Sequence, residues 1–155
     1  MIKINITLQN YNEALNKFNT NLLDNDLDQF IFNNCKHVTK KEKISLIINS
    51  DNLNIEQQNQ LKSIIHNYYR KEYNHFKKID QYDDYFRGIL LILGIIFIFL
   101  SEIFFSVVKE LFLIAGWVVI WEIVYDILFS GIKRKKEKMM YKKLANCQIE
   151  FNNNL

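Results

Sequence analysis

Two long apolar segments lie next to each other in the second half of the chain, and they constrain its fold more than any other feature. The first reads GILLILGIIFIFL from Gly88 to Leu100 and carries no charge. These residues alone are too few to cross a bilayer, but the segment continues past a Ser-Glu pair to Val108. The second reads LFLIAGWVVIWEIVYDILFSGI over residues 111–132, which is long enough to span.

A single helix through both segments would exceed 40 residues, far more than the hydrocarbon core needs. We therefore expect a hairpin of two transmembrane helices, at about residues 88–107 and 110–131, with the turn inside residues 101–110. The alternative is a soluble domain that contains a buried helical hairpin. The helices of such a domain need polar outer faces, and these segments have almost none.

The charges around the hairpin predict its orientation. Lys77, Lys78 and Arg87 precede the first segment, a basic run follows the second, and the turn holds one lysine. Positive residues favour the cytoplasmic side, so we expect a multi-pass protein of the cell (inner) membrane with both termini in the cytoplasm.

The basic run is expected to contact anionic lipid headgroups. It consists of Lys133, Arg134, Lys135, Lys136 and Lys138. Nucleic acid is the alternative partner for such a run. Lipid is the simpler partner, because the run directly follows an apolar segment.

The polar first half predicts a small α/β domain. Residues 2–8 alternate between apolar and polar side chains, as in a half-buried strand, and residues 43–50 predict a second strand. A helix is expected around residues 12–18. The Asp-Asn-Asp run at residues 24–26 is a candidate cap for a second helix, which would pass through Leu27 and Ile31 toward Cys35.

A long helix is expected to start at Asp51 or Asn54, because apolar side chains recur every three or four positions from Leu61. No glycine or proline interrupts this helix before Gly88. We expect it to continue as a stalk into the first membrane segment.

The tail predicts a third strand, since Cys147, Ile149 and Phe151 alternate with polar residues. This strand can pair with residues 2–8 or 44–48 if both ends of the chain lie on one side of the membrane. The expected fold is an α+β membrane protein whose small sheet, of two or three strands, has helices on one face. Its parts are a cytoplasmic α/β domain with a stalk helix (residues 1–86), a transmembrane hairpin (87–132) and a basic cytoplasmic tail (133–155).

Two carboxylates in the second apolar segment are the most unusual residues. Glu122 and Asp126 lie four apart and therefore share one helix face. A charged residue at the bilayer centre costs about 2.5–3.5 kcal/mol on insertion scales. One interpretation is a polar clamp between helices, with Arg87 as the partner that an antiparallel hairpin would bring near Asp126. The alternative is a proton or cation path.

Three other residues of this segment predict helix packing. Gly116 permits close approach of a neighbouring helix. Trp117 and Trp121 also lie four apart, and Trp121 is too deep for an interfacial aromatic belt. We expect both tryptophans to pack against a neighbour; the alternative is that they anchor the helix in lipid.

No motif of catalysis or metal binding is visible. His66 and His75 lie nine apart on the expected long helix and would point in opposite directions. Four glycines leave no Gly-rich phosphate loop, and no nucleophile elbow or metal-ligand spacing is present. We predict no enzyme activity, no metal and no cofactor.

The run IAGWVVIWEIVYDILF, followed by KRKKEKMMYKKLA, resembles a family of uncharacterised bacterial membrane proteins with two transmembrane helices. The likeness rests on a Gly-Trp-Val…Trp motif in the second membrane helix, here Gly116, Trp117, Val118 and Trp121, with the charged Glu122 beside it. The proline that many members have after the second tryptophan is missing. The family has no assigned activity, so the resemblance implies topology alone.

The function expected from these features is a membrane-anchored, non-enzymatic interaction or scaffold module. Its partners would be the lipid bilayer and either another protein or further copies of this chain, because a sheet this small has open edges. The alternative is an oligomeric pore, transporter subunit or membrane-active effector that uses Glu122 and Asp126.

Overall fold

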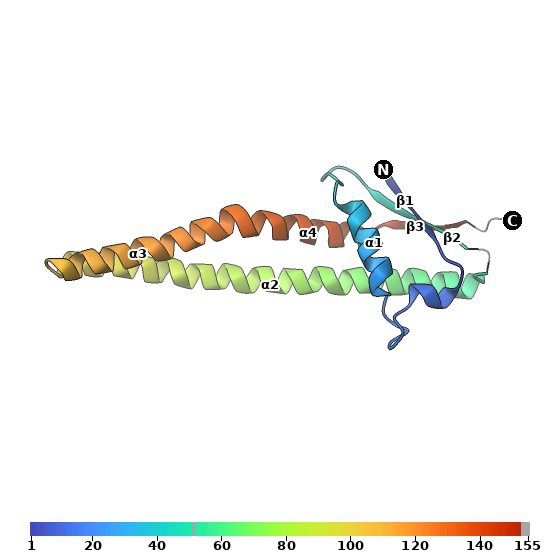
Figure 1. The fold of residues 1–155 in the computed structure, drawn as a ribbon, viewed down its shortest axis with the longest axis horizontal. Coiled ribbons are helices and arrows are strands. Elements are labelled where there is room, and N and C mark those ends of the chain that lie inside the picture. Colours follow the sequence, from blue (N-terminus) through green and yellow to red (C-terminus); the bar gives the residue numbers. More distant parts are fainter. Residues whose placement is uncertain (51, 153–155) are drawn as a thin grey trace. The chain divides into compact units, whose positions relative to one another are not determined.

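A computed structural model describes residues 1–50 and 52–152 (Figure 1). In chain order its elements are β1 (Ile2–Thr7), the 3-10 helix η1 (Tyr11–Ala14), α1 (Asn25–Cys35), β2 (Ile44–Asn49), α2 (Ile55–Ile103), α3 (Val107–Tyr125), the π-helix η2 (Asp126–Ser130), α4 (Gly131–Leu144) and β3 (Gln148–Asn152). The chain forms two compact units. We call residues 1–74 with 137–155 the sheet unit, and residues 75–136 the hairpin unit.

The sheet unit contains three parallel strands in the order β1-β2-β3. The central strand places Leu46 opposite both Ile4 and Ile149. Parallel neighbours require long crossover connections. Here α1 lies in the first connection, and the second contains the whole of α2, α3 and α4. The N-terminal and C-terminal strands therefore belong to one sheet, although the entire hairpin separates them in sequence.

The core of the sheet unit lies on one face of the sheet. In β1, Ile4 and Ile6 are buried while Lys3 and Asn5 are exposed, as the alternation of the sequence requires. The helices supply the other apolar side chains of this core, which include Ile31, Cys35, Leu61, Ile65, Tyr69, Met140 and Leu144.

The N-terminal ends of α1 and α2 are defined by side-chain caps. Asp24 accepts a hydrogen bond from the backbone of Asp26 at 2.9 Å, and α1 then runs to Cys35. Asn54 and Gln57 form a reciprocal capping box, with bonds of 2.7 and 3.1 Å. From there α2 continues without a break to Ile103, which confirms the expected long helix; the alternative start at Asp51 lies outside the described residues.

The helix expected around residues 12–18 is wrong, since only the short η1 forms there. The side chain of Asn16 accepts hydrogen bonds from the backbones of Phe18 and Asn19. These bonds compete with the helical ladder. A bridge between Leu15 and Leu23 then closes the segment into a compact loop.

Partly buried polar groups connect α1 to α2 inside the sheet unit. The hydroxyl of Tyr68 donates to Asp28 at 3.1 Å. Burial raises the pKa of Asp28, and the hydroxyls of Tyr69 and Tyr68 partly oppose that rise. Burial also raises the pKa of the Cys35 thiol to about 11 and that of Cys147 to about 12, which leaves both thiols protonated at neutral pH.

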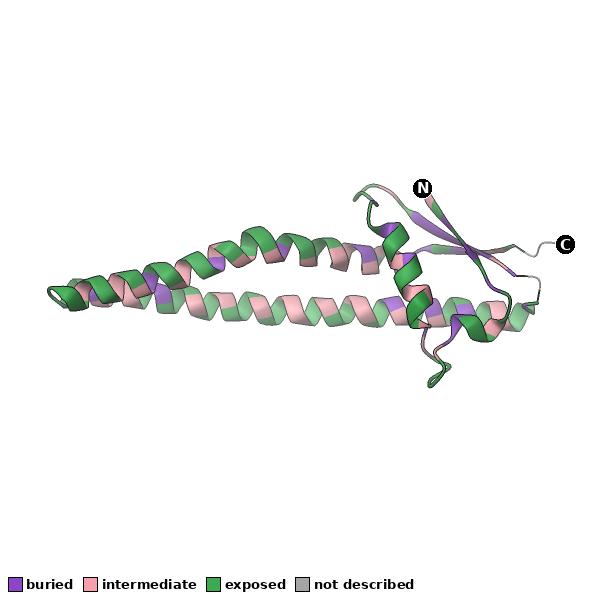
Figure 2. Ribbon diagram, in the orientation of Figure 1, coloured by how far each residue is buried: buried purple, intermediate pink, exposed green. Residues whose placement is uncertain are grey.

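The hairpin unit contains two helices long and apolar enough to cross a membrane. They belong to the continuous helical segments Ile55–Ile103 and Val107–Leu144, and only 11% of the most apolar stretch of each is buried (Figure 2). The turn covers residues 104–106, inside the expected range, and Ser106 adopts a left-handed φ of 59°. Glu102 and Lys109 pair across this turn at 3.4 Å.

The two helices of the hairpin meet most closely at a pair of glycines. A methyl group added at Gly116 would lie 2.7 Å from Ile98 Cγ1 and 3.0 Å from the carbonyl oxygen of Gly94. A methyl group at Gly94 would lie 3.0 Å from Ile120 Cγ1. The close approach of the helix backbones therefore leaves no room for a methyl group at Gly116, whereas at Gly94 the Ile120 side chain would have to move by a few tenths of an ångström.

Candidate functional site

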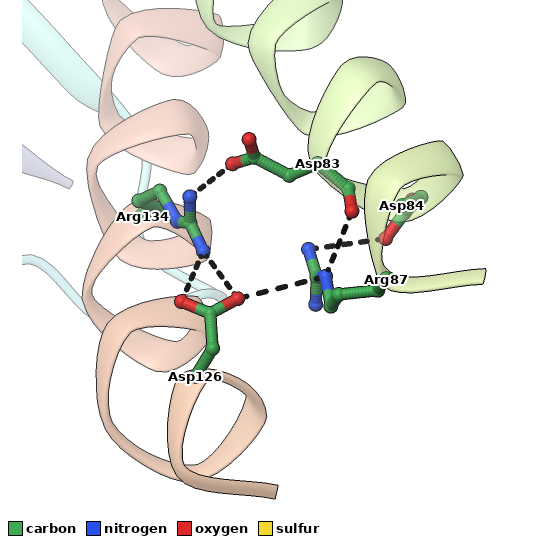
Figure 3. A network of polar contacts seen from close by, with 5 residues as sticks. All are labelled: Asp83, Asp84, Arg87, Asp126 and Arg134. Carbon is green, nitrogen blue, oxygen red and sulfur yellow. Dashed lines mark hydrogen bonds and ion pairs between the residues drawn. The ribbon is translucent and has the colours of Figure 1, made fainter. Parts of the chain in front are cut away.

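Five charged side chains of the hairpin unit form one polar cluster (Figure 3). Asp83, Asp84 and Arg87 belong to one turn of α2, just before the first apolar segment. Asp126 starts the π-helix η2 after α3, and Arg134 lies in the first turns of α4. We call this group the charge cluster. It brings together the two ends of the apolar hairpin.

Arg134 bridges two of the carboxylates. One nitrogen, Nη2, donates to both oxygens of Asp126, at 2.8 and 2.9 Å. The other, Nη1, donates to Oδ2 of Asp83. The planar guanidinium suits this role because its nitrogens point in fixed directions toward separate carboxylates.

Arg87 contacts Asp126 from the α2 side. Its Nε lies 3.5 Å from Asp126 Oδ2 and donates to the Asp83 carbonyl oxygen at 3.2 Å. Its Nη2 lies 3.2 Å from Asp84 Oδ1. Asp126 is therefore contacted by two guanidinium groups, and its side chain is 28% exposed.

The π-helix explains how Arg134 reaches Asp126. In a straight α-helix, residues eight apart differ by about 80° around the axis. The π-helix inserts about one extra residue into the turn that starts at Asp126. The eight residues from Asp126 to Arg134 then rotate about the helix axis as seven residues of a regular α-helix would. This reduces the angle between the two side chains to about 20°. The wide turn thus aligns both side chains on the face toward Asp83 and Arg87.

The sequence prediction paired Arg87 with Asp126 but missed Asp83 and Arg134. Arg134 was expected to contact lipid headgroups, whereas the structure places its guanidinium in the charge cluster. Regular helical periodicity could not reveal this, because the π-helix shifts the register between residues 126 and 134. Asp83, four residues before Arg87, was the available signal.

Glu122 behaves differently from Asp126. It lines an open cavity of about 240 Å³ together with Asp83, Arg87, Asp126 and Arg134. Glu122 is exposed, and its carboxylate makes no hydrogen bond or ion pair with any other described residue. The shared helix face thus carries one compensated and one uncompensated carboxylate.

The packing residues of α3 also separate into two groups. Gly116 makes the close helix contact described above. Trp117 and Trp121 remain 60% and 68% exposed, so the packing expected for them is not made within the chain. Both lie on the side of α3 that faces away from the glycine contact.

Most side chains of the basic run are exposed. Lys133, Lys135 and Lys136 are exposed, and Lys138 is half-buried. The three exposed lysines remain candidates for contact with headgroups. No group of three or more His, Cys, Asp or Glu side chains suited to a metal occurs among residues 1–50 and 52–152.

Comparisons with protein families, curated proteins and solved structures found no match for this chain. The resemblance to the Gly-Trp-Val…Trp membrane proteins therefore stays a prediction.

The chemistry of the charge cluster is that of a clamp. Three carboxylates surround two guanidinium groups, and every charged side chain in it has an opposite partner. Interactions of this kind join α2 to the segment that follows α3 in a mostly apolar hairpin. Removing one charged side chain of the cluster would leave the charge of its partner poorly compensated. An uncompensated charge in surroundings of low dielectric destabilises the fold.

Proposed function

We propose that the protein is a membrane-anchored, non-enzymatic interaction or scaffold module. In this proposal the hairpin unit crosses the bilayer twice, and the sheet unit binds another protein or a further copy of the chain in the cytoplasm. The observation that carries the proposal is the division of the chain into one unit with an apolar core and one with an apolar exterior.

The sheet supports an even number of crossings. β1 and β3 pair with the same central strand, so the segments before and after the hairpin must lie on the same side of any membrane. Two helices of suitable length meet this requirement. The excess of lysine and arginine beside the hairpin, with a single lysine in the turn, favours the cytoplasmic side of the cell membrane.

The charge cluster supports an anchor of fixed geometry. Its members lie at the ends of the apolar stretches, where α2 enters and where η2 and α4 leave. Ion pairs there hold the two helix ends together without requiring a charge at mid-membrane.

The sheet unit offers two open edges for a partner. β1 and β3 each pair on one side only within the described residues. Open edges of this kind are templates for an added strand. The exposed side chains of these two strands are polar and include Lys3, Asn5 and Glu150.

The interaction module is tested by photo-crosslinking in intact membranes, with a photoreactive amino acid at Asn5 in β1 or Glu150 in β3. The proposal predicts a discrete adduct from at least one strand and none from Phe105, an exposed residue of the turn. An adduct of twice the chain mass identifies self-association; another mass identifies a partner. Absence of adducts from both strands, or the same adducts from Phe105, contradicts the proposal.

A second candidate function is an oligomeric pore, and Glu122 is the observation that favours it. An exposed carboxylate that has no partner among the described residues and lies beside a cavity is unusual in an apolar helix. A pore predicts ion flux in proteoliposomes above that of empty vesicles, and a strong reduction of this flux in Glu122→Gln. The interaction module predicts background flux for both proteins.

A further inference from the structure

A polar groove in the sheet unit has the composition of a site for an anionic ligand. It has a volume of about 780 Å³ and lies between the first part of α2 and the loop that follows β1. Its floor includes the buried Leu15 and the half-buried Ile64. None of the described residues that line it carries a carboxylate.

One wall is a polar stripe on α2. Ser63, Asn67, Arg70 and Asn74 are spaced by four, three and four residues, so they share one helix face, and Lys71 lies beside them. Asn67 donates to Ser63 at 3.4 Å. A face of hydroxyl, amide and cationic groups at helical spacing can make several hydrogen bonds to one ligand.

The other wall comes from the loop, which supplies Tyr11, Asn12, Thr20 and Asn21. The hydroxyl of Tyr11 donates to Gln60 of α2 at 3.3 Å, which joins the two walls at one end. The backbone of this loop is held by the side-chain bonds of Asn16 and Asn19 and by the Leu15–Leu23 bridge. The amide groups of the wall are therefore presented by an ordered segment.

The charge of the groove is positive and uncompensated. Arg70 and Lys71 are exposed, and neither side chain makes an ion pair or hydrogen bond with any described residue. A neighbouring depression of about 410 Å³ shares Arg70, adds His66 and Asn146, and likewise has no carboxylate among its described lining. Arg70 thus lies between two acid-free hollows.

We propose that this groove binds a phosphate ester that carries hydroxyl groups, such as a phosphorylated cyclitol or sugar. Arg70 and Lys71 contact the phosphate, since guanidinium and ammonium groups form strong charge-assisted hydrogen bonds with its oxygens. The side-chain amides of Asn12, Asn21 and Asn67 bind the ring hydroxyls, and Tyr11 covers an apolar edge of the ring. The ligand is either a free molecule or the headgroup of a lipid, because both present the same chemistry.

The test uses the full chain in phosphatidylcholine nanodiscs and titrates myo-inositol 1-phosphate by calorimetry. We expect saturable binding at one site per chain, and at least tenfold weaker binding of both myo-inositol and inorganic phosphate. The double variant Arg70→Gln/Lys71→Gln should weaken binding at least tenfold. The matched control is Lys40→Gln/Lys41→Gln, which removes the same charge from exposed positions outside the groove and should stay within twofold of the parent.

A second set of nanodiscs distinguishes the two sources of the ligand. Part of the phosphatidylcholine is replaced by phosphatidylinositol, whose headgroup is the esterified form of the probe. At least tenfold weaker apparent affinity for the soluble probe in these discs identifies a lipid headgroup as the occupant, and unchanged affinity identifies a free ligand. No saturable binding in phosphatidylcholine discs, or equal weakening in the two double variants, overturns the proposal.

Discussion

The sheet unit and the hairpin unit differ in which side chains they bury. In the sheet unit apolar side chains such as Leu46 are fully buried and charged ones face outward. In the hairpin unit Ile92 and Trp121 are 61% and 68% exposed, whereas the members of the charge cluster other than Asp84 are only 20–30% exposed. The difference indicates that hydrophobic burial within the chain stabilises the first unit, whereas the apolar surface of the second is not covered by other described residues of the chain.

Among single alanine substitutions, we expect the largest loss of folding stability in the core of the sheet unit. Leu46→Ala removes a fully buried side chain from the central strand and should reduce the free energy of unfolding by about 2–5 kcal/mol. Ile92→Ala removes a similar volume from the exterior of the hairpin and should cost less than about 1 kcal/mol in detergent. Urea denaturation in micelles, followed by circular dichroism, measures both. Equal costs would erase the distinction between the units.

The charge cluster should be the most sensitive part of the hairpin unit. Arg134→Ala leaves Asp83 without its guanidinium partner and Asp126 with one partner instead of two. We expect a loss of about 1–3 kcal/mol, below the range for fully buried ion pairs because these side chains are partly exposed. Lys135→Ala, which truncates the next and exposed residue, should change stability by less than about 0.5 kcal/mol.

A double-mutant cycle makes the clamp prediction specific. Asp126→Asn and Arg134→Gln, singly and together, should show a coupling energy of about 0.5–2 kcal/mol in the same denaturation assay. Additive effects would mean that the two side chains do not stabilise each other.

The glycine contact predicts opposite signs for two similar changes. Gly116→Ala places a methyl group against Ile98 and the Gly94 carbonyl and should cost about 1–3 kcal/mol. Gly88→Ala meets nothing within 4 Å and should stabilise α2 by up to about 1 kcal/mol. Thermal denaturation of both variants in the same detergent separates close packing from helix propensity. Destabilisation by both changes would argue against the close approach at Gly116.

The smallest effect concerns the pH dependence of the sheet unit. The pKa of Asp28 is raised in the fold, so the folded state holds this proton more tightly than the unfolded chain does. Its contribution to stability is present below the ordinary pKa of about 3.8 and is lost as pH rises through the raised value. Asp28→Asn keeps an acceptor for Tyr68 and should gain stability relative to the parent as pH rises. A stability difference that is independent of pH would contradict this reasoning.

Much of the fold follows from local sequence patterns. Alternation predicted β1 and β2, the Asp-Asn-Asp run at residues 24–26 predicted the start of α1, and the absence of helix breakers predicted the continuous α2. The third strand was also recognisable, but its place beside β2 depends on long-range pairing that no local pattern specifies. The false helix at residues 12–18 shows how asparagine side chains can replace helical hydrogen bonds with turn bonds.

The candidate site was less predictable because it depends on an irregular turn. The proximity of Arg87 and Asp126 follows from an antiparallel hairpin with a known turn. The contacts of Arg134 follow only once a π-helix is present at Asp126. The exposure of Trp117 and Trp121 likewise depends on how α3 is rotated about its axis, which is fixed by the Gly94–Gly116 contact.

The most direct test of the membrane-anchor proposal is the sidedness of two introduced cysteines. Ser106→Cys marks the turn of the hairpin and Lys40→Cys marks an exposed site of the sheet unit, while the native Cys35 and Cys147 are buried. A membrane-impermeant maleimide is applied to right-side-out and to inverted cell-membrane vesicles. We expect labelling of Ser106→Cys only in right-side-out vesicles and of Lys40→Cys only in inverted ones. Labelling of both sites from the same side would contradict it.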